Sequence, residues 1–213
     1  MLDILITDDH DIVRLGTSII VKEAYPNARV DQAANFEQAR DLLLKKPYHL
    51  LILDINMPGG NNIQMIQEVL SIQKDLKILV FSSYEESIYA LRYIHAGAVG
   101  YIGKNSSKEE LREAITTVLE QGKYMSADIH QLYYESLTIG RSSKLKANML
   151  NKLSNREMDV AKHLINGKNI AEVSKKLNLK SSTVSTYKTR IFEKLQIDNL
   201  PDLIDIFRLH DEG

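Results

Sequence analysis

The sequence predicts two domains: an α/β domain with a doubly wound, five-stranded parallel sheet, followed by a small all-α domain. Two observations lead to this prediction. Up to about residue 122, five short apolar runs alternate with longer amphipathic stretches, which is typical of βαβ units. From about residue 150 onward, the apolar residues recur with a helical period only.

The five apolar runs are rich in Val, Ile and Leu, and polar or turn residues flank each of them. We expect strands at Ile4–Thr7, Val30–Ala33, Leu50–Leu53, Ile78–Phe81 and Val99–Ile102. Such near-continuous apolar runs are typical of strands that are buried on both faces of a parallel sheet. Parallel strands need right-handed crossover connections, so helices should cover both faces of this sheet.

Helix signals lie between these runs. Three pairs of residues have the spacing of a capping box, in which a short side chain satisfies amide donors of the first helical turn. These pairs are Asn35 and Gln38, Ser83 and Glu86, and Ser106 and Glu109. Gly97 and Gly122 stand where a left-handed residue would end the preceding helix.

Residues 123–149 interrupt this alternation, and we expect them to link a first domain (residues 1–122) to a second (residues 150–213). Within the linker, a short helix over Asp128–Leu137 and a polar, basic tether over residues 139–148 are predicted.

The second domain has four predicted helices. The capping-box pair Ser154 and Glu157 precedes the first of them, which should end at Gly167. A helix over Ile170–Leu177 and a three-residue turn lead to a helix over Ser181–Leu195. The last helix is amphipathic, and its apolar stripe consists of Leu200, Leu203, Ile204 and Phe207.

The charge distribution favours a nucleic-acid partner for the second domain, although the net charge of the whole chain is only -1. Residues 152–197 carry 10 Lys and Arg against 4 Asp and Glu, whereas residues 1–123 carry 13 against 17. A basic block between acidic flanks fits a small nucleic-acid-binding unit. The alternative is an uneven surface without a function.

The composition excludes several classes of site. The chain has no Cys, which excludes disulfides, thiolate metal sites and thiol catalysis, and which fits a reducing compartment. The N-terminus lacks the basic segment of a signal peptide, and no apolar run approaches the ~18 residues of a membrane span. We therefore expect a soluble, cytoplasmic protein that does not enter a membrane.

Acidic side chains, a hydroxyl and an ammonium follow the predicted strands at their carboxyl ends, where doubly wound sheets bind ligands. Asp8 and Asp9 follow the first strand, Asp54 the third and Ser82 the fourth, and the fifth runs into Lys104. Asp8 and Asp9 could merely cap a helix, and Lys104 could be solvated, but the groups occur together at consistent strand ends. Clustered carboxylates favour a hard cation such as Mg²⁺, and the set suits phosphoryl transfer onto a carboxylate.

Residues 1–122 resemble the receiver domain of two-component response regulators, a flavodoxin-like fold with the strand order 2-1-3-4-5. The resemblance rests on Asp8-Asp9, on Asp54–Pro58, on the strand that ends in Ser82, and on Gly97–Lys104. It implies that Asp54 is the phosphoacceptor. It also implies that Mg²⁺ is held by Asp9, Asp54 and the backbone carbonyl of Asn56, with Asp8 assisting through water.

The same resemblance implies a switch beside the phosphoacceptor. Ser82 would be the hydroxyl that turns toward the phosphoryl group, Tyr101 the aromatic residue that follows it inward, and Lys104 the phosphoryl-pairing lysine. Two positions depart from the family pattern: Asn62 replaces a usual Gly, and Asn105 rather than Pro follows Lys104. Neither departure removes a catalytic group.

Residues 150–210 resemble the LuxR-type helix-turn-helix domain, so the whole chain is similar to a NarL/FixJ-type response regulator. The resemblance rests on Leu153–Glu157, Gly167–Glu172, Leu177 and Thr183–Leu195. In the predicted recognition helix, a stripe spaced for burial consists of Val184, Tyr187, Ile191 and Leu195, and Tyr187 stands where many relatives have His.

The other faces of this helix carry short hydroxyls, which let it lie close in a DNA groove, and long cations, which reach phosphates. We expect base contacts from Ser185, Thr186 and Thr189, and backbone contacts from Lys180, Ser182, Lys188, Arg190 and Lys194. Thr183 could contact phosphate or support the first turn. The alternative is that these side chains form an ordinary solvent-exposed face of the helix and contact no DNA.

The stripe of the last helix could close the core of its own domain. In the resembled family this helix also commonly forms the dimer contact, which would involve Leu200, Leu203, Ile204 and Phe207. Two recognition helices about one DNA turn apart would then read a roughly two-fold symmetric, double-stranded site.

The hypothesis from sequence is therefore a DNA-binding transcription regulator whose only catalysis is its own phosphorylation and slow dephosphorylation. A sensor histidine kinase would phosphorylate Asp54, and the change would either free the DNA-binding domain or promote homodimers. A phosphatase with an aspartyl-phosphate intermediate is one alternative, but such enzymes commonly have an acid at the position of Asn56. A degenerate receiver that works without phosphorylation is another, although all the needed groups are present.

Overall fold

The computed structural model describes residues 1–57, 60, 62–138 and 149–211. It contains two compact units, Met1–Tyr133 and a second that begins at Tyr134, and each is described by itself. Pro58 and the predicted tether at residues 139–148 lie outside the described residues. None of the described helices has the length and hydropathy that a membrane span requires.

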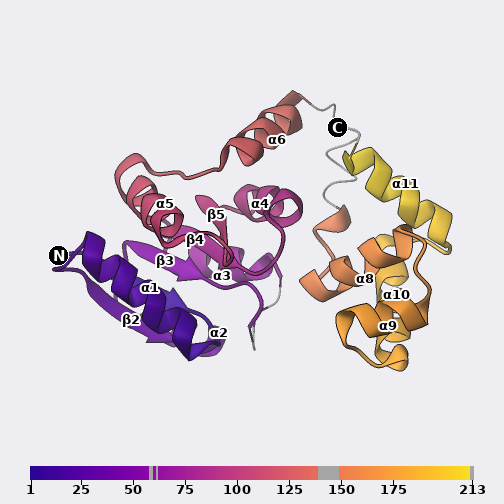
Figure 1. Ribbon diagram of the computed structural model, residues 1–213, viewed down its shortest axis with the longest axis horizontal. Coiled ribbons are helices and arrows are strands. Elements are labelled where there is room, and N and C mark those ends of the chain that lie inside the picture. The colour runs from indigo at the N-terminus through magenta and orange to yellow at the C-terminus, as the bar shows by residue number, and fades with distance from the viewer. Residues whose placement is uncertain (58–59, 61, 139–148, 212–213) are drawn as a thin grey trace. The chain divides into compact units, whose positions relative to one another are not determined.

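The first unit is built on the parallel sheet seen in Figure 1. Its strands lie in the order β2-β1-β3-β4-β5, which the family resemblance implies. The strands are β1 (Asp3–Thr7), β2 (Arg29–Ala33), β3 (Leu50–Leu53), β4 (Lys77–Ser82) and β5 (Gly100–Gly103). Each begins and ends within one residue of its predicted bounds. All residues of the central strand β3 are buried, which explains its uninterrupted apolar sequence.

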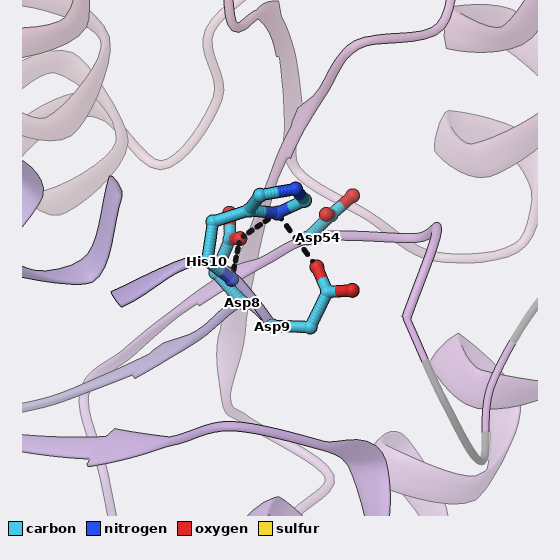
Figure 2. Close-up of side chains that lie close together, drawn as sticks. All are labelled: Asp8, Asp9, His10 and Asp54. Carbon is cyan, nitrogen blue, oxygen red and sulfur yellow. Dashed lines mark hydrogen bonds and ion pairs between the residues drawn. The ribbon is translucent and has the colours of Figure 1, made fainter. Parts of the chain in front are cut away.

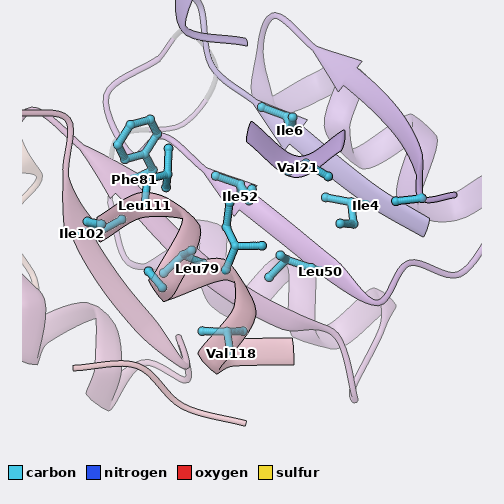
Figure 3. Packing of buried hydrophobic residues seen from close by; sticks show 13 residues of the cluster. Ile4, Ile6, Val21, Leu50, Ile52, Leu79, Phe81, Ile102, Leu111 and Val118 are labelled. Atoms are coloured by element: carbon cyan, nitrogen blue, oxygen red, sulfur yellow. The ribbon is translucent and has the colours of Figure 1, made fainter. Parts of the chain in front are cut away.

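Helices alternate with these strands and cover both faces of the sheet, as right-handed crossovers require. They are α1 (Asp11–Ala24), α2 (Phe36–Lys45), α3 (Gln64–Ile72), α4 (Glu86–His95) and α5 (Lys108–Gln121). Helix α1 packs beside α5, and α2 beside α3. Figure 3 shows the core of the α1–α5 face, where Ile6, Ile52 and Leu79 of the strands meet Val21 of α1 and Val118 of α5.

The helix boundaries confirm some of the predicted caps and correct others. Asn35 caps α2 by accepting from the Gln38 amide (2.9 Å). The Ser83–Glu86 box is wrong, because α4 begins after Glu85, whose side chain makes no cap hydrogen bond. The Ser106–Glu109 box is wrong by one residue: Ser107 and Glu110 cap α5. This part of the chain has two consecutive Ser and two consecutive Glu, so the spacing alone does not distinguish the pairs.

The two departures from the family pattern are accommodated without unusual backbone geometry. Asn62 does not adopt a positive φ; its side chain accepts a hydrogen bond from the Gln64 amide (2.9 Å) at the start of α3. No peptide bond in the described residues is cis, so the bond between Lys104 and Asn105 is trans, as is usual before a non-proline residue. Gly97 and Gly122 do have positive φ angles of 116° and 91°, as predicted.

The first unit continues past residue 122, at which the sequence suggests a boundary. Tyr124 forms a parallel bridge with Gly100 at the free edge of β5, and its amide donates to the Val99 carbonyl (2.9 Å). Helix α6 (Ala127–Thr138) follows and spans the predicted short helix. Its Ile129 is buried, and the Tyr133 ring lies 5.9 Å from the His95 ring of α4. The start of the linker is therefore packed onto the α4–β5 side of the sheet.

The second unit contains α8 (Asn155–Ile165), α9 (Ile170–Leu177), α10 (Ser181–Leu195) and α11 (Leu200–Asp211). The α9 and α10 bounds are those predicted. Capping boxes start α8, at Ser154 and Glu157 as predicted, and α9, at Asn169 and Glu172. A left-handed Asn178 (φ 52°) ends α9 and allows the tight turn into α10. The buried core includes Leu153, Val160, Leu164, Val173, Val184, Ile191, Leu195, Leu203 and Phe207.

We predict that replacing Gly100 by Ala destabilises the first unit by about 1–3 kcal/mol, because the added methyl group overpacks a filled space. A Cβ at this position would lie 2.9 Å from Leu79 Cδ1 and 3.1 Å from the Tyr124 carbonyl oxygen. Gly103 in the same strand is the control, because its nearest atoms lie 4.0 Å from the added Cβ. Urea unfolding followed by circular dichroism measures both variants. Equal stability of the two variants would contradict the close packing of residue 124 on β5.

Candidate functional site

The sheet register gathers the predicted site residues at one edge. The register of β1 and β3 makes Asp8 and Asp54 neighbours, because the residues directly before them are paired. The register of β4 and β5 brings Lys104 beside Ser82, whose carbonyl oxygen accepts a hydrogen bond from the Lys104 amide (2.7 Å). The groups that follow different strands in the sequence are therefore close in space.

Lys104 joins two buried carboxylates at this edge. Its Nζ lies 2.6 Å from Asp8 Oδ2 and 2.7 Å from Asp54 Oδ2. The side chains of Asp8 and Asp54 are only 3% and 2% exposed. Burying a carboxylate is costly unless it is paired, so the ammonium is required by both acids. One positive charge facing two negative charges also leaves the pocket with an excess of negative charge.

Burial and pairing act in opposite directions on the pKa values of this pocket. Burial raises the pKa of Asp54 above its ordinary range, and the hydrogen bond from Lys104 offsets only part of this effect. Burial would lower the pKa of Lys104, but its hydrogen bonds with Asp54 and Asp8 outweigh burial and raise it. The lysine is therefore held in its charged form, while the charged form of Asp54 is only partly compensated by it.

Asp9 and His10 form the exposed rim of the pocket (Figure 2). His10 Nδ1 lies 2.8 Å from Asp9 Oδ1 and 3.1 Å from Asp8 Oδ1. Ligand atoms of Asp8, Asp9, His10 and Asp54 all lie within 4.8 Å of one another. The sequence singles out the three acids but not His10. The only signal for it was its position directly after the acidic pair.

The donor set of this rim fits a hard divalent cation. Three carboxylates supply oxygen ligands, and Asp9 remains accessible from solvent, as a cation that retains water molecules requires. Asn56 lies at the same edge, because its backbone amide donates to Asp54 Oδ1 (3.0 Å). The residues therefore fit Mg²⁺, as the sequence suggests.

Ser82 and Tyr101 are both buried beside the pocket. Ser82 is fully buried, and its Oγ accepts a hydrogen bond from the Tyr84 amide (3.3 Å). Tyr101 already points inward, and its hydroxyl donates to the Tyr84 carbonyl oxygen (3.0 Å). The Tyr84 hydroxyl in turn donates to Asn56 Oδ1 (3.2 Å). Tyr84, which the sequence does not single out, thus connects the β4–α4 loop to the loop after Asp54.

In the second unit, α10 and the residue before it present most of the predicted DNA-contacting side chains to solvent. The exposed ones are Lys180, Ser182, Ser185, Thr186, Thr189, Arg190 and Lys194; Thr183 and Lys188 are half-buried. The hydroxyls of Thr186 and Thr189 donate to the carbonyls one turn earlier, which leaves their acceptor sites open. Lys188 lies over the Phe192 ring, 5.4 Å from its centroid. Their contacts with DNA stay a prediction.

Lys194 differs from the other predicted contacts, because it has a partner inside its own unit. Its Nζ lies 2.6 Å from Oε2 of Glu157, whose side chain is only 3% exposed. The same Glu157 oxygen accepts from the Ser154 amide of the α8 capping box (2.7 Å). Lys194 therefore compensates a buried carboxylate, a role that cannot be read from helix spacing.

The predicted dimer residues divide between core and surface. Leu203 and Phe207 are buried in their own unit, whereas Leu200 and Ile204 are half-buried. Ile206, which the predicted stripe omits, is also buried. Leu203 and Phe207 thus close the core of the second unit, and their part in a dimer stays a prediction. In α10, Val184, Ile191 and Leu195 of the predicted apolar stripe are buried, whereas Tyr187 is only half-buried.

The chain is similar to known proteins over nearly its whole length. A family model described as the response regulator receiver domain matches residues 4–116, and one described as bacterial regulatory proteins, luxR family, matches residues 151–207. Response regulator GacA of Pseudomonas protegens is 33% identical over 204 residues, covering 93% of this chain and 92% of the relative. Fimbriae Z protein of Escherichia coli K12 is 29% identical over 210 residues, covering 98% and 97%.

Solved structures share this architecture. A RcsB response regulator of Salmonella typhimurium has a TM-score of 0.58 at 23% identity, with 97% of this chain and 98% of that chain covered. A structure of two RcsB dimers bound to two parallel DNAs has a TM-score of 0.59 at 22% identity, with 98% of each chain covered. A LuxR-family two-component response regulator from Aurantimonas sp. SI85-9A1 is 31% identical (TM-score 0.56), covering 64% of this chain and 98% of that chain.

We predict that replacing Glu157 by Gln lowers the free energy of unfolding of the second unit by about 1–2 kcal/mol at neutral pH, because a hydrogen bond between charged groups is lost. Gln still accepts from the Ser154 amide, so the capping box is kept. Glu172 is the matched control: it occupies the same place in the α9 capping box but is exposed.

Glu157→Gln should also make the free energy of unfolding of the second unit depend less on pH in the acid range. Burial would raise the pKa of Glu157, but hydrogen bonds from Lys194 and Ser154 outweigh burial and lower it below the ordinary 4.5. The unfolded chain therefore takes up the proton at higher pH, so the stabilisation is complete above 4.5 and is lost as the pH falls through the folded pKa. Urea unfolding over a pH series checks this, and an unchanged acid slope in the variant would refute it.

Proposed function

The chain belongs to the NarL/FixJ-type response regulators, which join a receiver domain to a LuxR-type DNA-binding domain, and we propose that phosphorylation of Asp54 by a sensor histidine kinase controls its binding to DNA. The observation that carries the proposal is the half-buried Lys104, bonded to the buried Asp8 and Asp54 at the carboxyl edge of the sheet. This arrangement supplies a carboxylate that can accept a phosphoryl group and an ammonium that can pair with the negative charge of that group.

In the proposed reaction, a carboxylate oxygen of Asp54 attacks the phosphorus atom of the phosphohistidine. A P–O bond forms, the P–N bond breaks, and the kinase histidine leaves with the electron pair of that bond. Mg²⁺ held by Asp9, Asp54 and the Asn56 carbonyl, with Asp8 assisting through water, would neutralise charge on the phosphoryl oxygens. Lys104 keeps its charge in the pocket and pairs with the product, which carries more negative charge than the carboxylate it replaces.

The proposed switch starts at Ser82, whose hydroxyl turns toward the phosphoryl group and gives up its bond with the Tyr84 amide. The β4–α4 loop then loses a hydrogen bond at Tyr84, the residue that also bonds Asn56 and Tyr101. Tyr101 is buried before this change, so we propose that it exchanges its bond with the Tyr84 carbonyl rather than moving in from solvent. The start of α4 shifts as a result.

The output of the switch is DNA binding by the second unit. We propose that α10 enters the major groove with Ser185, Thr186 and Thr189 facing bases, while Arg190 and Lys188 contact phosphates. A homodimer, formed at least after phosphorylation, would place two such helices on a roughly two-fold symmetric site. A phosphatase function has less support, because the residue two positions after Asp54 is Asn56, whose side chain is an amide and not an acid.

We predict that acetyl phosphate with Mg²⁺ adds one phosphoryl group to the wild-type chain and none to Asp54→Ala, since the substitution removes the proposed attacking carboxylate while Asp8 keeps its ion pair with Lys104. Intact-mass and peptide mass spectrometry measure the site. Asp75→Asn, an exposed acid, is the control and should be labelled like wild type. Labelling of Asp54→Ala to the wild-type extent would refute Asp54 as the acceptor.

Phosphorylation should also change dimer formation or DNA affinity in wild type but not in Asp54→Ala. Analytical ultracentrifugation and DNA titrations, each with and without acetyl phosphate, report these two outputs separately. Identical responses of the two proteins would refute the switch while leaving the chemistry of Asp54 intact.

We predict that Arg190→Ala weakens binding to generic double-stranded DNA and reduces the slope of log affinity against log salt by about 1, because one phosphate contact is lost. The paired replacement of Lys194 by Met and Glu157 by Gln should leave this slope unchanged, since Glu157 already neutralises Lys194. Fluorescence anisotropy at several salt concentrations measures both. A reduced slope in the paired variant would show that Lys194 contacts DNA. An unchanged slope in Arg190→Ala would show that Arg190 does not contact a DNA phosphate.

A further inference from the structure

His10 occupies an unusual position between the acidic pair and α1. It is the residue before the first turn of α1, yet its side chain makes no cap hydrogen bond with that helix. Its backbone amide donates to Asp8 Oδ1 (2.9 Å), which fixes the main chain beside the pocket. The ring instead points back, so that Nδ1 contacts one oxygen each of Asp8 and Asp9 (Figure 2).

This contact places the imidazole in competition with a hard cation. Nδ1 lies 2.8 Å from Asp9 Oδ1, an oxygen that a cation at this rim would use. Mg²⁺ prefers oxygen ligands and retained water, and imidazole is a poor ligand for it. The His10 ring therefore competes with Mg²⁺ for this oxygen of Asp9. The side chain is 63% exposed and does not cap α1, so it can turn into solvent without disturbing the helix.

The same contact offers a nitrogen ligand to a different class of cation. Borderline first-row cations such as Ni²⁺ bind imidazole well and also accept carboxylate oxygens. One ligand atom of His10 lies within 4.8 Å of one ligand atom from each of Asp8, Asp9 and Asp54. A nitrogen and several oxygens thus converge where Mg²⁺ would find oxygens alone.

We propose that His10 sets the metal preference of this pocket: it opposes a hard cation such as Mg²⁺ and completes a mixed nitrogen–oxygen ligand set for a divalent transition cation such as Ni²⁺. The inference rests on the proposed cation site at Asp9 and Asp54. Removing the imidazole should therefore tighten the binding of Mg²⁺ and weaken the binding of Ni²⁺. A general loss of structure or of negative charge would weaken the binding of both cations.

The test is calorimetric titration of the untagged, full-length chain with MgCl₂ and, separately, with NiCl₂ at one fixed pH. His10→Ala should lower the Kd for Mg²⁺ by about two- to five-fold, because the contacts it removes lie at an exposed rim. It should raise the Kd for Ni²⁺ by about ten-fold or more, because a ligand is lost. His130→Ala, which removes an exposed histidine on α6, is the control and should change neither Kd.

His10→Asn separates the two effects, because its amide nitrogen stands near the place of Nδ1 but ligates metals poorly. This variant should bind Mg²⁺ like wild type and Ni²⁺ like His10→Ala. If His10→Ala changes both Kd values in the same direction, or changes neither, the inference is overturned while the cation site stands. If wild type binds neither cation, the proposed cation site fails, and the inference fails with it.

Discussion

The rest of the first unit is organised around one ammonium group held between two buried carboxylates. Lys104 satisfies Asp8 and Asp54 at once, and it can do so only because β1, β3 and β5 end at the same edge of the sheet. Among the described residues, Lys104 is the one Lys or Arg paired with either carboxylate, and His10 contacts Asp8 only from the exposed rim. A change of charge on Asp54 must therefore change what Lys104 binds.

The contacts around Asp54 also explain why such a change need not stay local. Asn56 bonds Asp54 with its amide and Tyr84 with its side chain, and Tyr84 is bonded by Tyr101. Two residues further, Glu86 at the start of α4 bonds the Ser126 side chain, which also caps α6. The β4–α4 loop is thus tied to the acceptor on one side and to the beginning of the linker on the other, so a rearranged loop alters both.

Much of this was predictable from residue order. Strand positions, the sheet-edge cluster and the α9–α10 turn follow from apolar runs, turn residues and parallel topology, which are local or periodic signals. The rest depends on contacts between distant residues. Glu157 and Lys194 are 37 positions apart, and nothing in the pattern of α10 distinguishes Lys194 from a phosphate-binding lysine. His10 and Tyr84 escaped prediction because their side-chain directions, set by the loop backbone, carry no sequence period.

The shared ammonium can be tested by a mutant cycle in the first unit, measured by urea unfolding in the presence of a chelator. The effect of Lys104→Met on the free energy of unfolding is compared in wild type and in the double variant Asp8→Asn, Asp54→Asn. In that double variant both carboxylates are replaced by neutral amides, which need no cation. The structure predicts a loss of about 3–5 kcal/mol in wild type and a much smaller loss in the neutral background. Equal losses in the two backgrounds would show that Lys104 stabilises the unit by packing alone and would contradict the account.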